Sequence, residues 1–161
     1  MICGKTCEGR KFVNKLTASK SIHMYEHSTQ IRVRYAETDQ MDVVYYGNYA
    51  QYFEVGRAES IREMGFTYKK MEEMGVYMPV VQLEIKYIRP AHYDDLITVK
   101  TMVKELPQAH EIVFHHEVHN ENGKLLTTGR VTLYFMDSKT GRKSSMPEEL
   151  RTILGPFFQA R

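Results

Sequence analysis

The sequence predicts a single α+β domain in which one long helix packs against an antiparallel sheet. One long amphipathic helical segment occurs in the first half of the chain, and four strand-like segments follow it in a row. Strands and helices do not alternate, which argues against a parallel, doubly wound sheet. A helix with a single apolar face is buried by one surface, here the concave side of the sheet. The length of 161 residues fits one domain with a sizeable core.

The first predicted elements are a strand over residues 27–35 and the long helix. Apolar and charged residues alternate along the strand, and a polar loop over 36–42 follows it. The helix is predicted to begin at Asn48 as its N-cap and to stop at Gly65, because these residue types favour those positions. Its buried face is predicted from helical spacing to consist of Tyr49, Tyr52, Phe53, Gly56, Ser60, Ile61 and Met64.

The second half is predicted to supply most of the sheet. A short helix over 67–74 precedes strands over 77–88, 96–106, 111–120 and 125–137. Asn122-Gly123 is predicted to be a two-residue hairpin turn between the last two strands. A helical turn over 147–154 closes the chain. We therefore expect five to six antiparallel strands in a domain over 26–161, preceded by a poorly ordered extension over 1–25. An organellar transit peptide is an alternative for that extension.

Composition excludes several classes of protein. A formal net charge of +2 does not favour nucleic acid or an anionic membrane surface as the main partner. No apolar run approaches the ~20 residues of a membrane-spanning helix. The two cysteines, Cys3 and Cys7, lie near the start, so the predicted domain has neither a nucleophilic thiol nor the ligands of a structural zinc site. We expect a cytoplasmic protein that uses no metal and no cofactor.

The loop before the long helix carries the candidate chemistry. Asp39 is a carboxylate on a loop held by a rigid scaffold, the usual position of a catalytic group. The backbone N–H groups near Tyr46 and Gly47 lie at the start of the helix, where free donors stabilise negative charge. Together they provide a base or nucleophile and an oxyanion site for acyl transfer from sulfur. The alternative is a surface aspartate that caps a turn.

This stretch resembles the 4-hydroxybenzoyl-CoA thioesterase family and the related bacterial acyl-CoA thioesterases of the YbgC type. The resemblance covers most of the chain, roughly residues 31–147. It rests on Asp39, Asp42, Val43, Val44, Tyr45, Tyr46, Gly47, Asn48 and Tyr49, and continues through Phe53, Glu54, Arg57, Tyr87–Ala91, Asp94 and Asp95. Asp42 occupies the place of a usual glycine, so a positive φ there would strain the backbone. Gly47 occupies a place that is often His or Pro.

The resemblance implies a hotdog fold, an antiparallel sheet wrapped around one long central helix. It implies homodimers with continuous sheets, often joined into homotetramers, and an active site at the subunit interface. Asp39 matches the catalytic aspartate, as nucleophile or general base, and the Tyr46 position matches the backbone N–H that binds the thioester carbonyl.

Substrate-binding residues are predicted at both ends of the substrate. Tyr45 and Tyr49 are candidates for lining an acyl pocket, and the Asn48 side chain for ordering the active-site turn. Arg89 and Lys104 are candidates for binding CoA phosphates, although each also fits a solvated surface cation.

The sequence thus indicates an acyl-CoA thioesterase, with an acyl carrier protein as the alternative acyl donor. A hotdog 3-hydroxyacyl-thioester dehydratase is a second candidate, but that chemistry usually needs a histidine, and the loop before the helix has none. A non-catalytic acyl-thioester binding module is the third.

Overall fold

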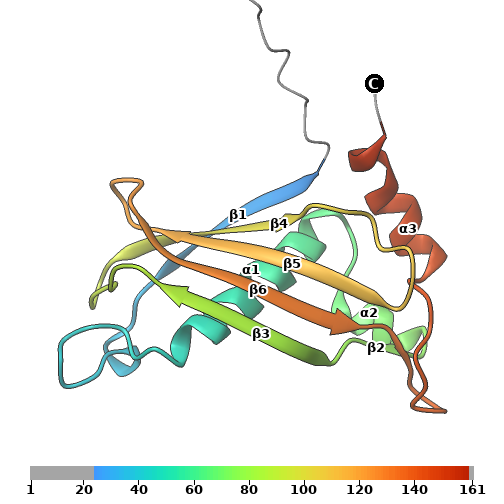
Figure 1. Cartoon of the computed structure of the whole chain (residues 1–161), viewed down its shortest axis with the longest axis horizontal. Helices are drawn as coiled ribbons and strands as arrows, with labels where there is room; N and C mark the ends of the chain where they lie inside the picture. Colours follow the sequence, from blue (N-terminus) through green and yellow to red (C-terminus); the bar gives the residue numbers. More distant parts are fainter. Residues whose placement is uncertain (1–23, 160–161) are drawn as a thin grey trace, which may run out of the picture.

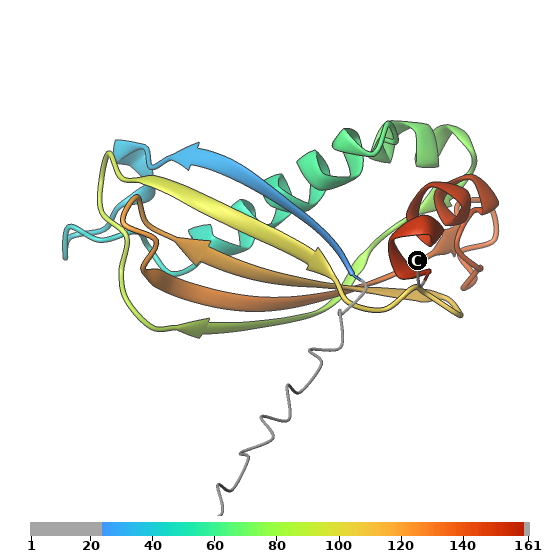
Figure 2. The same cartoon turned by 90° about the horizontal axis from the view of Figure 1, so that it is seen from above.

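The structure is a computed structural model that describes residues 24–159 (Figure 1). Five antiparallel strands form one sheet in the order β1-β4-β5-β6-β3. The strands are β1 (Tyr25–Arg32), β3 (Val80–Tyr87), β4 (Leu96–Val103), β5 (Glu111–His119) and β6 (Leu125–Tyr134). The helix α1 (Asn48–Glu63) lies against one face of this curved sheet (Figure 2). The predicted α+β class and five-stranded antiparallel sheet are confirmed.

The smaller elements lie around this two-layer unit. They are η1 (Tyr35–Glu37), α2 (Tyr68–Glu73), β2 (Val76–Tyr77), β7 (Met136–Asp137), α3 (Glu148–Leu154) and η2 (Gly155–Phe158). The strands β2 and β7 pair with each other in a second, two-stranded sheet. None of the helices within residues 24–159 has the length and apolarity needed to cross a bilayer.

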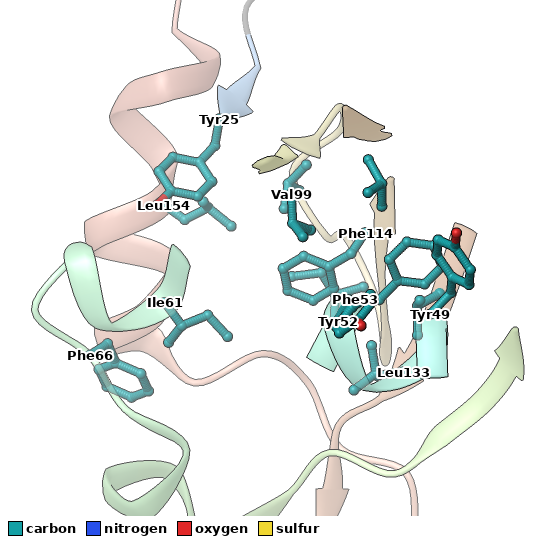
Figure 3. Packing of buried hydrophobic residues seen from close by; sticks show 14 of the residues in the cluster. Tyr25, Tyr49, Tyr52, Phe53, Ile61, Phe66, Val99, Phe114, Leu133 and Leu154 are labelled. Carbon is teal, nitrogen blue, oxygen red and sulfur yellow. The ribbon is translucent and has the colours of Figure 1, made fainter. Parts of the chain in front are cut away.

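Close packing between α1 and the sheet depends on two glycines. A Cβ atom on Gly56 would lie 2.7 Å from Val99 Cγ1 of β4, and one on Gly129 would lie 2.3 Å from Phe53 Cε2. The helix therefore approaches β4 and β6 more closely than any larger residue at these positions would permit. The buried face of α1 consists of Tyr49, Tyr52, Phe53, Gly56, Arg57, Ser60 and Ile61. Its four apolar members, Tyr49, Tyr52, Phe53 and Ile61, lie among the packed core side chains in Figure 3. The prediction missed Arg57, and Met64 is only partly buried.

Two local predictions are wrong. The first strand ends at Arg32, and Tyr35 lies 78% exposed in η1, because Arg34 and Glu37 bond to each other and fold this segment into a 3-10 turn. The hairpin turn is longer than Asn122-Gly123. Asn120 Oδ1 accepts hydrogen bonds from the N–H groups of Asn122 and Lys124, so a five-residue loop forms over 120–124. Gly123 adopts φ +70° within it.

The predicted domain boundary falls at the edge of the described residues. Tyr25 is the first residue of β1, and its ring is buried. Of the poorly ordered extension predicted over 1–25, residues 1–23 lie outside the described residues, whereas Tyr25 belongs to the sheet.

Candidate active site

Asp39 opens a tight turn that leads from η1 towards α1. Its N–H donates to Val43 O (2.9 Å), and its carbonyl accepts from Asp42 N (3.0 Å). Asp42 has φ +60°, which confirms the strained backbone expected where an aspartate takes the place of a glycine. A further bridge pairs Thr38 with Val44, so the segment forms a small hairpin with Asp39 near its tip.

The carboxyl group of Asp39 is partly exposed and lines a cavity of about 280 Å³. Its Oδ1 atom accepts a hydrogen bond from Met41 N (2.8 Å), which fixes the side-chain rotamer. Within residues 24–159, Oδ2 accepts no hydrogen bond from the protein. One oxygen therefore orients the group while the other remains available to a ligand. The cavity is mostly apolar and is completed by Met41, Val43, Val44, Tyr46, Tyr49, Tyr87, Ile88, Arg89 and Pro90.

The N-terminus of α1 lies next to this hairpin. Gly47, not Asn48, is the N-cap residue, so the predicted capping role of Asn48 is wrong. The Asn48 side chain instead donates through Nδ2 to Glu37 O (2.7 Å), because the hairpin brings that carbonyl to the start of the helix. Over the described part of the chain, the backbone N–H groups of Tyr46 and Gly47 donate to no protein acceptor. These are the two donors that the sequence assigned to an oxyanion.

Three tyrosines form one wall of the cavity. The Tyr87 hydroxyl donates to Tyr46 O (3.0 Å), and Ala91 N donates to the Tyr49 hydroxyl (3.1 Å). The Tyr87 ring lies 5.5 Å from Tyr49 and 6.4 Å from Tyr46, both edge to face. Burial, followed by the neighbouring phenols, raises the pKa of Tyr87, so its hydroxyl remains a donor at neutral pH. The sequence did not predict this contact, because Tyr87 was noted only as part of the stretch that resembles the thioesterase family.

Glu37 is the functional candidate that sequence reasoning missed. It is 5% exposed, and its carboxylate accepts hydrogen bonds from Arg34 and from the hydroxyl of Tyr52. Burial alone would raise the pKa of Glu37, but these hydrogen bonds outweigh it and hold the pKa below its usual range. The three-residue spacing of Arg34 and Glu37 was the available signal, since opposite charges three residues apart can pair within one turn.

The predicted binding residues are only partly brought together. Tyr46, Tyr49 and Arg89 share the cavity of Asp39, although Arg89 Nη1 donates to Leu125 O (3.0 Å). Gly47 and Asn48 lie at the start of α1 without lining the cavity.

Tyr45 and Lys104 lie apart from the cavity. The Tyr45 ring packs on Tyr46 at 4.5 Å. Lys104 lines two other hollows, of about 380 and 480 Å³, with His115 and Arg130. Within one chain, Lys104 and Asp39 therefore line different cavities. Across the described residues, no group of three His, Cys, Asp or Glu side chains is placed to hold a metal ion.

The arrangement is suited to the hydrolysis of an activated acyl group. A carboxylate with one unengaged oxygen faces an apolar cavity, and unpartnered main-chain donors lie at the adjoining helix N-terminus. The carboxylate can take a proton from water or attack a carbonyl carbon, and the donors can bind an oxyanion.

Comparisons with known proteins agree with this chemistry. Residues 33–154 match the family model described as the thioesterase-like superfamily. The chain is 40% identical over 102 residues to the candidate acyl-CoA thioesterase YneP of Bacillus subtilis (strain 168), covering 63% of this chain and 73% of that protein. It is 32% identical over 125 residues to the acyl-CoA thioesterase YbgC of Haemophilus influenzae, covering 77% of this chain and 90% of the relative. Among solved structures, the DHNA-CoA thioesterase of Staphylococcus aureus superposes with a TM-score of 0.75 at 35% identity, covering 80% of this chain and 87% of that one.

Proposed function

The chain belongs to the thioesterase-like superfamily, and from this premise we propose that it hydrolyses acyl-CoA thioesters with Asp39 as the catalytic carboxylate. The observation that carries the proposal is the position of Asp39. Its carboxyl group lines an apolar cavity together with Tyr46, beside the N-terminus of α1. The relatives named as acyl-CoA thioesterases support CoA as the carrier of the acyl group.

The proposed reaction places the thioester carbonyl between Asp39 and the N–H groups of Tyr46 and Gly47. Asp39 either removes a proton from water, whose oxygen attacks the carbonyl carbon, or attacks that carbon itself to form an anhydride that water then hydrolyses. Negative charge develops on the carbonyl oxygen and is stabilised by the two N–H groups. The C–S bond breaks, and the thiolate takes up a proton and leaves as free CoA. The products are a carboxylic acid and a thiol, and we propose that no cofactor takes part.

We further propose that the active enzyme is at least a homodimer, joined through strand β3. This strand is terminal in the sheet, and seven of its eight residues are exposed. Proteins usually protect such edges with charge, proline or a short strand. The exposed residues of the other edge strand, β1, are all polar or charged (Glu26, Ser28, Gln30 and Arg32), whereas β3 exposes the apolar or aromatic residues Val80, Val81, Leu83 and Tyr87 alongside Gln82, Glu84 and Lys86. Because Tyr87 also lines the Asp39 cavity, a second β3 would lie close to the site.

Light scattering tests the dimer. We expect light scattering to give the wild-type protein the mass of a dimer or tetramer. Leu83→Lys, which places a charge on the exposed edge, should yield monomers, whereas the matched variant Gln30→Lys on β1 should keep the wild-type mass. A wild-type monomer at tens of micromolar, or a Leu83→Lys variant of unchanged mass, would contradict the proposed interface.

A thiol-release assay tests the proposed function. The panel contains short, long and aromatic acyl-CoAs and one acyl carrier protein thioester, with and without EDTA. We expect thiol release by the wild-type protein in both conditions, and about a 10²- to 10⁴-fold lower kcat for Asp39→Asn, the usual contribution of a general base. Asp42→Asn is the control because asparagine also tolerates positive φ. Thiol release by Asp39→Asn at the wild-type rate would refute the assignment.

A further inference from the structure

The buried carboxylate of Glu37 lies two residues before Asp39. Its Oε1 accepts from Arg34 Nε (2.8 Å), and its Oε2 accepts from Arg34 N (2.8 Å) and from Tyr52 OH (2.9 Å). A buried charge is unfavourable unless hydrogen bonds and an opposite charge compensate it, and here both oxygens are engaged. Glu37 therefore has no free oxygen with which to act on a substrate.

The carbonyl of the same residue holds the start of the helix. Glu37 O accepts from Tyr45 N (2.9 Å) and from Asn48 Nδ2 (2.7 Å). Tyr45 and Asn48 flank Tyr46 and Gly47, the two residues whose N–H groups are the proposed oxyanion donors. The main chain of Glu37 thus fixes both ends of the segment that carries these donors.

The side chain of Glu37 adds a third attachment, one turn further into the helix. Tyr52 lies in α1 four residues after Asn48 and is 2% exposed. Burial, and then the hydrogen bond to Glu37, raises the pKa of Tyr52, so its hydroxyl stays a donor over the working pH range. Glu37 consequently joins the Asp39 loop to Tyr45, just before α1, and to Asn48 and Tyr52 within α1, the last of them 15 residues away in sequence.

We propose that Glu37 is a positioning residue for the hydrolysis, which holds the Asp39 carboxylate in register with the N–H groups of Tyr46 and Gly47. This inference rests on the proposed thioesterase activity. A displacement of about 1 Å between reacting groups lowers a rate by about 10²-fold, so a residue that fixes two halves of a site affects kcat without touching the substrate.

Glu37→Gln is the direct test because it keeps the size of the side chain and removes its charge. A glutamine amide has one acceptor oxygen, so its NH2 group must face either the Arg34 guanidinium or the other donors. We expect kcat to fall about 10- to 100-fold while KM changes less than about threefold. The matched control is Glu59→Gln, since Glu59 also accepts from an arginine three residues away, Arg62, but lies near the far end of α1. Its kinetics should equal those of the wild-type protein.

A double variant separates positioning from general stability. If Glu37 acts through Asp39, adding Glu37→Gln to Asp39→Asn should reduce kcat by less than about twofold. Tyr52→Phe provides a milder change that removes one hydrogen bond and keeps the buried ring, and we expect kcat to fall about 3- to 10-fold with folding retained. This variant keeps the test informative if Glu37→Gln does not fold.

The outcomes are distinct. A wild-type protein that releases no thiol overturns the proposed function and this inference with it. An active wild-type protein overturns this inference alone if Glu37→Gln or Tyr52→Phe retains the wild-type kcat. This inference is also overturned if Glu37→Gln raises KM and leaves kcat unchanged. It is overturned as well if the double variant loses kcat by the product of the two single-variant losses.

Discussion

The hydroxyl of Tyr87 offers a sharp test of the oxyanion site, because it bonds to the peptide that carries the Gly47 donor. Tyr87 OH donates to Tyr46 O at 3.0 Å, and this carbonyl shares its peptide group with Gly47 N–H. A hydrogen bond to the carbonyl fixes the peptide plane and polarises the N–H, which therefore donates more strongly. Tyr87→Phe removes this contact and keeps the ring in the aromatic wall of Tyr46 and Tyr49.

The expected size follows from the kind of contact that is lost. Removing an oxyanion donor outright lowers kcat about 10²- to 10³-fold, but here the donor stays and loses only its support. A neutral hydrogen bond has a net value of about 0.5–1.5 kcal/mol, which corresponds to about a 2- to 10-fold lower kcat.

Steady-state thiol release gives kcat and KM for Tyr87→Phe and for Tyr77→Phe, an exposed tyrosine of β2 used as the control. A wild-type kcat in Tyr87→Phe, or an equal loss of kcat in both variants, would refute a role for the Tyr87 hydrogen bond in supporting the Gly47 donor.

Two further predictions concern the packing of α1 and the acid stability of the fold. Gly129→Ala would place a Cβ 2.3 Å from Phe53 and should lower the free energy of unfolding by about 1–3 kcal/mol in a urea titration, whereas Gly155→Ala, with nothing within 4 Å, should not. His116 is 1% exposed, and burial, with repulsion from nearby cations, lowers its pKa to about 3. The unfolded chain therefore binds the proton more tightly than the folded protein does. The free energy of unfolding should fall by about 1 kcal/mol per pH unit as the pH drops below 6.5. His116→Leu should show a shallower loss over this pH range, and equal slopes would contradict the assignment.

The sequence predicted the large elements because their signals are local. Apolar residues at helical spacing identified the face of α1, and positive φ at Gly65 confirms the predicted stop of the helix. The strain at Asp42 also followed from one residue in one motif. Where local signals compete, the prediction was wrong. Asn48 has the chemistry of an N-cap, but the hairpin presents Glu37 O to its side chain.

The network around Glu37 could not be predicted because its partners meet only in the folded chain. A glutamate in a polar loop is expected at the surface, and its burial depends on Tyr52, which α1 brings from 15 residues away. The same limit applies to Lys104. Its charge suggested a phosphate ligand, yet its place beyond the end of β4 puts it with His115 and Arg130, in hollows that Asp39 does not line.

The most direct test is a crystal structure of the protein with a non-hydrolysable acyl-CoA analogue in which a methylene group separates sulfur from the carbonyl. The carbonyl oxygen is predicted to lie about 2.7–3.1 Å from the backbone nitrogen of Tyr46 or Gly47, with the Asp39 carboxylate facing the carbonyl carbon directly or through one water. An analogue bound with its carbonyl away from the N-terminus of α1, and with no approach to Asp39, would contradict the account.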